Sequence, residues 1–141
     1  MKSKGVGALG EDVTDFWLKC QGYRILHRGW RSRWGEIDII AYHDNFLIFI
    51  EVKTRKKYNW DHGGLLAVND SKQNKLRLTA EIFLSVNPQY QDVSCRFDIV
   101  CLRYYLSSEN PDQEQFKLLN DSCIIYDKYK FEVAFYLKNA F

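Results

Sequence analysis

Two acidic residues and a lysine stand within apolar runs and could together hold a divalent metal ion. Asp38 interrupts the apolar run 37–40, and after twelve intervening residues Glu51 and Lys53 flank Val52 in a second run. Carboxylate and carbonyl oxygens are the ligands that Mg²⁺ and Mn²⁺ prefer, so Asp38, Glu51 and the Val52 carbonyl are candidate ligands. The ammonium of Lys53 could orient an attacking water and stabilise the charge that develops on a phosphate.

The two runs are predicted to be neighbouring strands joined by a tight turn. Strands are expected at 35–42 and 46–54, because both segments are rich in isoleucine and other β-forming residues. Asp44-Asn45 between them is typical of a two-residue hairpin loop, and such a loop determines which residues face each other across the pair.

With that register the charged side chains of the two strands share one face. Asp38 lies opposite Glu51 and Glu36 lies opposite Lys53, and all four point the same way because side chains alternate along a strand. Like charges directly opposite each other destabilise a strand pair, and these two carboxylates would be roughly 5 Å apart. A divalent metal would compensate them. Glu36 would then either ligate the metal or stand beside it and neutralise the lysine; we favour the supporting role.

A salt-bridged hairpin without metal is the alternative. In it Glu36 pairs with Lys53, and Asp38 pairs with Arg33 or Arg55. Exposed pairs of this kind contribute little to stability. This alternative explains poorly why the two acids should face each other.

The segments around the hairpin predict helices packed against a mixed sheet, which is an α/β fold. Segments 55–69 and 107–115 are expected to be loops because they are polar or lack periodicity. The expected elements are a helix at 8–20, a strand at 23–27, the two hairpin strands, a helix that Ser71 caps and that ends before Asn87, a strand at 93–104, short edge strands at 116–119 and 123–126, and a closing helix at 129–139.

Composition favours a folded protein, and the positions of its histidines disfavour serine or cysteine hydrolase chemistry. The chain has 141 residues, of which 46% are hydrophobic and 16% aromatic, which is enough for one domain with a real core. The four cysteines lack zinc-site spacing and are expected to be reduced. The three histidines form no nucleophile–base pattern with a serine or cysteine. Neither a signal peptide nor a membrane span is recognisable, so a cytoplasmic protein without membrane association is expected.

Basic residues gather around the acidic hairpin and suggest a nucleic-acid partner. From 24 to 57 there are eight Lys or Arg against four Asp or Glu, although the whole chain has a net charge of only +2. Between 28 and 34 cations alternate with the aromatic rings of Trp30 and Trp34, which suits phosphate contact and stacking on an unpaired or branched nucleotide. A hydrated basic edge with its tryptophans in the core is the alternative. The candidate nucleic-acid-binding residues are Arg28, Trp30, Arg31, Arg33, Arg55, Lys56, Lys57, Lys72 and Lys75.

Several motifs together resemble the YraN-like family of bacterial proteins. The resemblance covers about residues 5–103 and the extreme C-terminus, and Asp38 with Glu51-Val52-Lys53 matches the Asp…(Asp/Glu)-x-Lys signature of the PD-(D/E)xK nuclease superfamily. The motifs are Gly10-Glu11, Gly22-Tyr23, Trp30-Arg31, Gly35-Glu36-Ile37-Asp38, the run 49–55, Lys72, Arg96-Phe97-Asp98 and Asn139-Ala140-Phe141.

The resemblance implies a restriction-endonuclease-like fold, with a central mixed sheet flanked by helices, similar to archaeal Holliday junction resolvases. It implies one endonuclease-like domain over 1–141, with a core at 5–103 and a variable extension at 104–141. It also implies a Mg²⁺- or Mn²⁺-dependent endonuclease that hydrolyses DNA at branched or flapped structures, and a homodimer by analogy with the resolvases. Glu11 is implied as a third metal ligand, although an exposed first-turn carboxylate is the alternative. Asp98 is expected to be a structural partner of Arg96 or of a backbone amide.

This chain departs from the usual family pattern at Gly29, where asparagine is common, in the loop 60–63, and in a longer segment 104–130. Loops and tails are where substrate contacts are found, so the expectation of branched or flapped DNA rests on the likeness to the resolvases and not on this chain's own residues. Two other functions fit the same residues. One is a non-catalytic nucleic-acid-binding protein of nuclease fold, and the other is a protein-interaction scaffold.

Overall fold

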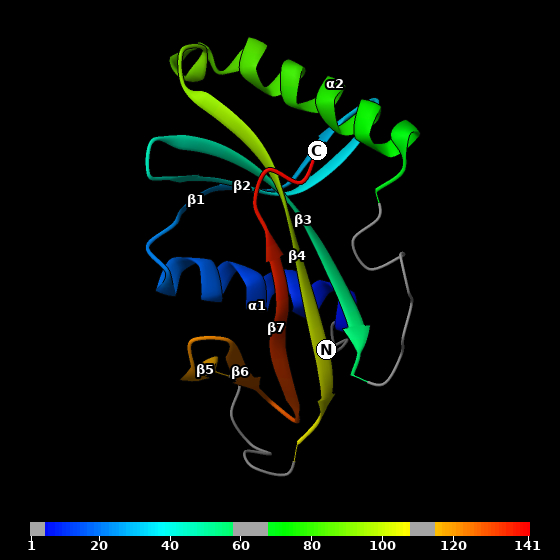
Figure 1. Ribbon diagram of the computed structural model, residues 1–141, viewed down its shortest axis with the longest axis vertical. Coiled ribbons are helices and arrows are strands. Elements are labelled where there is room, and N and C mark those ends of the chain that lie inside the picture. Colours follow the sequence, from blue (N-terminus) through cyan, green and yellow to red (C-terminus); the bar gives the residue numbers. More distant parts are fainter. Residues whose placement is uncertain (1–4, 58–67, 108–114) are drawn as a thin grey trace.

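Seven strands form one mixed sheet in the computed structural model, which describes residues 5–57, 68–107 and 115–141. The strand order is β1-β2-β3-β4-β7-β6-β5, and only β3 and β4 run parallel among the described pairs. Helices α1 and α2 flank the sheet, as the α/β prediction requires, and the arrangement is restriction-endonuclease-like (Figure 1). The elements are α1 (Val6–Cys20), β1 (Arg24–Ser32), β2 (Gly35–His43), β3 (Phe46–Lys56), α2 (Asp70–Val86), a 3₁₀ turn η1 (Pro88–Tyr90), β4 (Ser94–Leu106), β5 (Lys117–Asn120), β6 (Cys123–Tyr126) and β7 (Tyr129–Leu137).

The predicted hairpin turn is confirmed, and so is its register from His43 to Ile39, but the predicted pairs Asp38–Glu51 and Glu36–Lys53 are not part of the ladder. Asp44 and Asn45 both have a positive φ, 52° and 67°, which is the conformation of a two-residue hairpin loop. The β2–β3 ladder runs from the pair His43–Phe46 to the pair Ile39–Ile50 and ends there. The first residues of β2 then pair with β1 alone.

The two faces of the sheet hold separate cores. Successive residues of β3 alternate between them: Ile48 and Ile50 pack in the core beneath α1, and Leu47 and Phe49 pack in the core beneath α2. Phe83 is fully buried at the centre of the second core. This alternation is the period-2 pattern of a strand that is covered on both faces.

The predicted closing helix at 129–139 is wrong, because most of this segment is strand β7. It pairs antiparallel with β4 and β6, and it follows a turn in which Asp127 has a φ of 54°. A register shift between Cys101 and Leu102 of β4 interrupts the regular pairing. The segment is rich in tyrosine, phenylalanine and valine, and its backbone covers the edge that β4 would otherwise expose.

Smaller expectations are refined. Asn69 rather than Ser71 caps α2, since its side chain accepts a hydrogen bond from the N–H of Lys72 at 2.8 Å. The strand expected at 23–27 extends to Ser32. Most of the two expected loops, 58–67 and 108–114, lies outside the described residues. All four cysteines are free, two of them buried and two exposed. Neither described helix has the length and apolar character needed to cross a membrane.

The expected structural role of Asp98 is confirmed. Its fully buried carboxylate accepts hydrogen bonds from Arg96 Nε at 3.1 Å, from the Tyr136 hydroxyl at 2.6 Å and from the N–H of Asn139 at 2.9 Å. The last residues continue this attachment, because the ring of Phe141 stacks on that of Phe97 with centroids 4.9 Å apart. A buried carboxylate with this many donors fastens the C-terminus to β4.

Helix α1 lies against β3 at Gly10. A Cβ at this position would collide with Thr54 Oγ1 and would lie 3.1 Å from its Cβ and 3.2 Å from its Cγ2, so rotating the threonine side chain would not clear the space. Gly10 is therefore required by the close approach of helix and strand, and it places the next residue, Glu11, over the sheet.

We expect Gly10→Ala to destabilise the protein by about 1–3 kcal/mol, because overpacking forces α1 away from β3. Gly7→Ala is the matched control: it lies in the same helix, is exposed and has nothing within 4 Å of the added Cβ. Its higher helix propensity should stabilise the protein by roughly 0.5–1 kcal/mol. Denaturant unfolding measures both effects, and equal free energies of unfolding for the two variants would contradict the close approach.

Candidate metal centre

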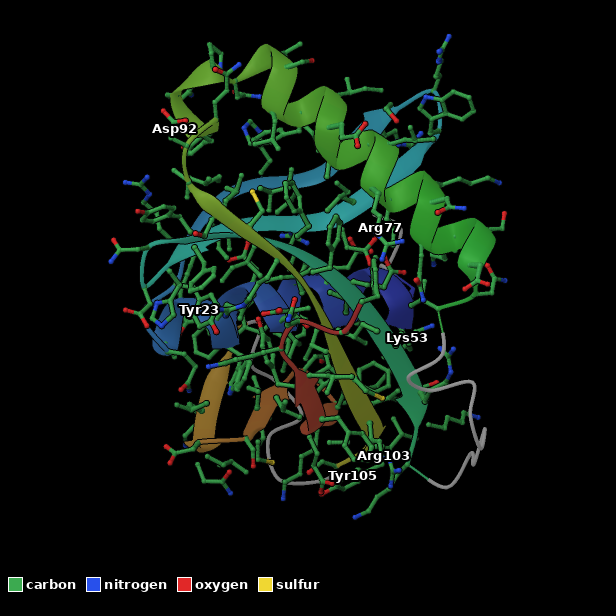
Figure 2. The ribbon with its side chains drawn as sticks, turned by 45° about the horizontal axis from the view of Figure 1, so that its top comes forward. Tyr23, Lys53, Arg77, Asp92, Arg103 and Tyr105 are labelled. Atoms are coloured by element: carbon green, nitrogen blue, oxygen red, sulfur yellow. The ribbon has the colours of Figure 1, made fainter. Side chains whose placement is uncertain are left out.

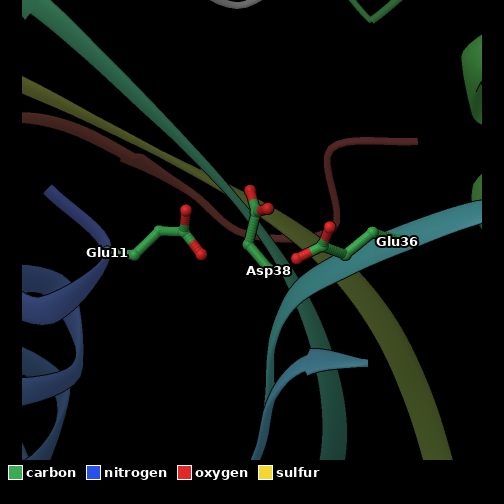
Figure 3. Close-up of side chains that lie close together, drawn as sticks. All are labelled: Glu11, Glu36 and Asp38. Atoms are coloured by element: carbon green, nitrogen blue, oxygen red, sulfur yellow. The ribbon is translucent and has the colours of Figure 1, made fainter. Parts of the chain in front are cut away.

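Three carboxylates meet where α1 passes β2. Oxygen atoms of Glu11, Glu36 and Asp38 all lie within 4.8 Å of one another. Figure 3 shows Glu11 reaching from α1 toward Asp38, with Glu36 on the other side of Asp38. The structure therefore brings Glu11 into the acidic group, as the family resemblance implied, and places Glu36 there as well.

Asp38 is held by the backbone of the neighbouring strand. Its Oδ2 accepts a hydrogen bond from the N–H of Val52 at 2.8 Å. This contact lies just beyond the last pair of the β2–β3 ladder. The Asp38 side chain therefore accepts a hydrogen bond from β3 at the point where the backbone of β2 no longer pairs with it. The expected role of the Val52 carbonyl as a ligand stays a prediction, since the observed contact involves the N–H.

Glu36 occupies space that Gly29 leaves open. A Cβ on Gly29 would lie 2.8 Å from Glu36 Oε1, and Gly29 has a φ of 60° within β1. Glu36 also pairs with Arg31, with Oε2 3.2 Å from Nε, and not with Lys53 as the salt-bridged alternative required. That alternative also paired Asp38 with Arg33 or Arg55, but Arg55 donates to the carbonyl of Thr54.

Burial and neighbouring negative charges raise the pKa of two of these acids, Asp38 and Glu11. Burial, the negative charge of Glu51 and then those of Glu11 and Glu36 raise the pKa of Asp38 to about 7, although the Val52 hydrogen bond opposes the shift. Burial and then Glu36 raise the pKa of Glu11, while Arg28 opposes this shift. Close carboxylates without enough positive charge produce this behaviour.

Glu51 is the predicted ligand that lies outside the group of three. Its Oε1 accepts a hydrogen bond from Lys72 Nζ at 2.7 Å, and Lys72 belongs to the first turn of α2. The charge of Glu51 nevertheless raises the pKa of Asp38, so the two acids interact. The expected single row of four charges is divided, with Glu36 and Asp38 beside α1 and Glu51 bound to α2.

Lys53 lies within this charged region. Figure 2 shows it on β3, between α2 and the ends of β3 and β4 near Arg103 and Tyr105. Burial lowers its pKa, and the positive charge of Lys72 lowers it further, while Glu51 opposes the shift. Lys53 and Lys72 are thus two neighbouring ammonium groups beside the acids.

The donor set suits a hard divalent cation. The group offers carboxylate oxygens from three residues, with Glu51 nearby, and Mg²⁺ and Mn²⁺ prefer such ligands. Burial and then the negative charge of Glu51 raise the pKa of Asp38, and a bound cation would favour its ionised form against both effects. Glu11, Glu36 and Asp38 are therefore the residues best placed to hold the metal, and Glu51 could join them by leaving Lys72.

The basic segment before β2 is divided between core, ion pairs and surface. Arg28 pairs with Asp12 at 2.6 Å and with Asp15 at 3.4 Å. The partly buried Trp30 ring packs edge-on against Phe83 in the α2-side core, with centroids 5.3 Å apart.

The other candidate cations have varied surroundings. The Arg33 guanidinium lies 4.8 Å from the centroid of Trp34. Lys56 is the exposed last residue of β3. Lys57 forms an ion pair in which its Nζ lies 3.6 Å from Glu132 Oε1. Lys75 lines a cavity beside the acids, together with Lys72. Nucleic-acid binding by these residues stays a prediction.

Sequence reasoning missed the contact between Lys72 and Glu51, because no signal in the neighbouring sequence joins a residue of β3 to one of α2. It did single out Trp34 for stacking, and this residue is 39% exposed and lines the same cavity as Lys72.

We expect the stability of the metal-free protein to depend on pH through Asp38. A carboxyl whose pKa rises from its ordinary 3.8 to about 7 binds a proton more tightly when folded. Its contribution is therefore complete below pH 4 and is lost as the pH rises to 7. The free energy of unfolding, relative to that of Asp38→Asn, should fall over this range by up to roughly 1.4 kcal/mol per pH unit.

Urea unfolding at a series of pH values measures this difference. Asp44→Asn is the control, since it removes an exposed carboxyl from the turn of the same hairpin. It should keep the pH dependence of the wild type. A wild-type protein and an Asp38→Asn variant with parallel pH profiles would contradict the position given to Asp38.

Known proteins match the chain over most of its length. Residues 10–102 match the uncharacterised protein family UPF0102. A UPF0102 protein of Trichodesmium erythraeum (strain IMS101) is 48% identical over 124 residues, which cover 79% of this chain and 68% of that protein. UPF0102 proteins of Synechocystis sp. and Trichormus variabilis are 39% and 38% identical, each over 97% of its own length and over 96% and 100% of this chain. The YraN-like resemblance is thereby confirmed, and the chain belongs to family UPF0102, part of the PD-(D/E)xK nuclease superfamily.

Proposed function

We propose that this protein is a Mg²⁺- or Mn²⁺-dependent nuclease that hydrolyses phosphodiester bonds of DNA in the cytoplasm. The observation that carries the proposal is the half-buried Asp38, held among Glu11 and Glu36 with Glu51 near enough to raise its pKa. Acids whose pKa is shifted by burial and by neighbouring charges are typical of functional sites. Membership of a nuclease superfamily supports the same conclusion.

The residues divide the work. Asp38, Glu11 and Glu36 would hold the cation, and the Val52 N–H keeps the Asp38 carboxylate in place. When bound, the cation polarises a phosphoryl oxygen and makes water a better nucleophile. Lys53, whose charged form is stabilised by Glu51, would stabilise the negative charge that develops at phosphorus.

Lys72 has a second task in this proposal. In the absence of metal its ammonium neutralises Glu51 at 2.7 Å. Substrate and cation together would allow Lys72 to move to the phosphate backbone while Glu51 turns to the cation. After this exchange every charged group still has an opposite charge beside it: Glu51 has the cation, and Lys72 has the phosphate.

One observation favours a second function, a nucleic-acid-binding protein without catalysis. The pair Glu51–Lys72 and the hydrogen bond from Val52 to Asp38 already provide partners for both signature acids. In that case the protein would bind DNA in a salt-sensitive way and leave it uncut.

Cleavage of labelled linear, flapped and four-way DNA with Mg²⁺ or Mn²⁺ tests the proposal. We expect Asp38→Asn, Glu51→Gln and Lys53→Met each to lower the rate by about 10²–10³, with DNA binding retained. Glu81→Gln and Lys117→Met make the same chemical changes at exposed positions of α2 and β5 and should keep the wild-type rate. Metal-independent cleavage, or none by the wild type on any of these DNAs, would refute the proposal.

A further inference from the structure

A cavity of about 340 Å³ opens beside the metal centre, between the β1–β2 turn and the start of α2. Its walls combine an aromatic ring, two ammonium groups and small polar side chains. The lining residues are Trp34, Gly35, Glu36, Asn69, Ser71, Lys72, Lys75 and Leu76.

The cavity is continuous with the acidic group. Glu36 lines the cavity and also belongs to the group with Asp38. Lys72 lines it too, and its ammonium lies 2.7 Å from Glu51. A molecule in the cavity would therefore lie against residues on both sides of the divided site.

The aromatic wall is fixed to the opposite wall. The backbone N–H of Trp34 donates to the Ser32 hydroxyl at 3.0 Å. That hydroxyl forms a second hydrogen bond of 2.8 Å with the hydroxyl of Thr79 in α2. Thr79 is fully buried, and Arg33 lies over the Trp34 ring at 4.8 Å. The turn that carries Trp34 is thus tied to the helix that carries Lys72, and the distance between the two walls is set before a ligand binds.

The size and chemistry of the cavity suit one nucleotide. Its volume lies at the lower end of the roughly 300–1,000 Å³ typical of small-ligand sites. An exposed indole provides a stacking surface for a base, and lysines provide contacts for phosphate. A base in a duplex is already stacked and paired, so it enters such a cavity only when it is unpaired or turned out of the helix.

We propose that this cavity binds the base and phosphate of a single unpaired nucleotide, in DNA or RNA, with Trp34 stacking on the base and Lys72 and Lys75 contacting the phosphate. The bond to be cut would be the neighbouring phosphodiester, a clause that rests on the proposed function. Substrates would then be strands with unpaired nucleotides, such as flaps, junctions and single strands, in preference to continuous duplex.

Fluorescence anisotropy without divalent metal tests the cavity separately from cleavage. The probes are a short labelled oligothymidylate, an oligouridylate and a blunt DNA duplex, at low salt where the phosphate contribution is strongest. Trp34→Ala should weaken single-strand binding by about tenfold and duplex binding by less than about twofold. Trp34→Phe, which keeps an aromatic ring, should recover most of the single-strand affinity. Phe135→Ala, at an exposed aromatic of β7, is the control and should change neither.

A uniform loss of affinity for all probes in Trp34→Ala, or no loss at all, would overturn the cavity proposal even if the protein cuts DNA. A selective loss for single strands in a protein that cuts nothing would support the cavity and refute only the nuclease. Tighter retention of one oligonucleotide would show whether DNA or RNA is preferred. If the wild type binds none of the three probes, the cavity proposal is overturned, and the cleavage assay with Mg²⁺ or Mn²⁺ decides the nuclease separately.

Discussion

A hydrogen bond from the N–H of Val52 to the carboxylate of Asp38 defines the centre of this molecule. It lies at the point where β2 stops pairing with β3, so the two strands separate around a side chain and not around a loop. The separation exposes Asp38 to Glu11 on one side and to Glu36 on the other, and also to the charge of Glu51 (Figure 3). A region of high negative charge is thereby built into a rigid sheet.

The two helices complete this region from opposite faces. Helix α1 approaches β3 closely enough to require Gly10, and the next residue adds a carboxylate. Helix α2 begins at a cap on Asn69, and its first turn adds Lys72. One helix therefore supplies negative charge and the other supplies positive charge. A site with both can hold a cation and a phosphate at the same time, because each charge has an opposite partner in the complex.

Local signals in the sequence were sufficient for the hairpin. A two-residue turn with Asp44-Asn45 determines the register, and alternation then separates the faces of β3. The same signals could not show that the ladder ends at Ile39, since the first residues of β2 leave β3 and pair with β1 alone, and this long-range choice has no local signature. They could not identify the partner of Glu51 either, because Lys72 is brought close by the packing of α2 and not by neighbouring sequence.

Long-range pairing explains the main error. Strand β7 alternates imperfectly because its pairing with β4 contains a register shift, so Phe131 and Phe135 imitate a helical spacing. The segment becomes a strand because its backbone pairs with the edge of β4, which a reading of the local sequence does not include. Tryptophans raised a similar difficulty: Trp30 and Trp34 look equivalent in sequence, yet one packs on Phe83 and the other lines a cavity.

Calorimetric titration with Mn²⁺ at pH 8, where Asp38 is ionised, tests the metal centre most directly. We expect saturable binding by the wild type and a loss of about tenfold or more in affinity in Glu11→Gln and Asp38→Asn. Saturable Mn²⁺ binding of equal strength in the wild type and both variants would show that these carboxylates hold no metal.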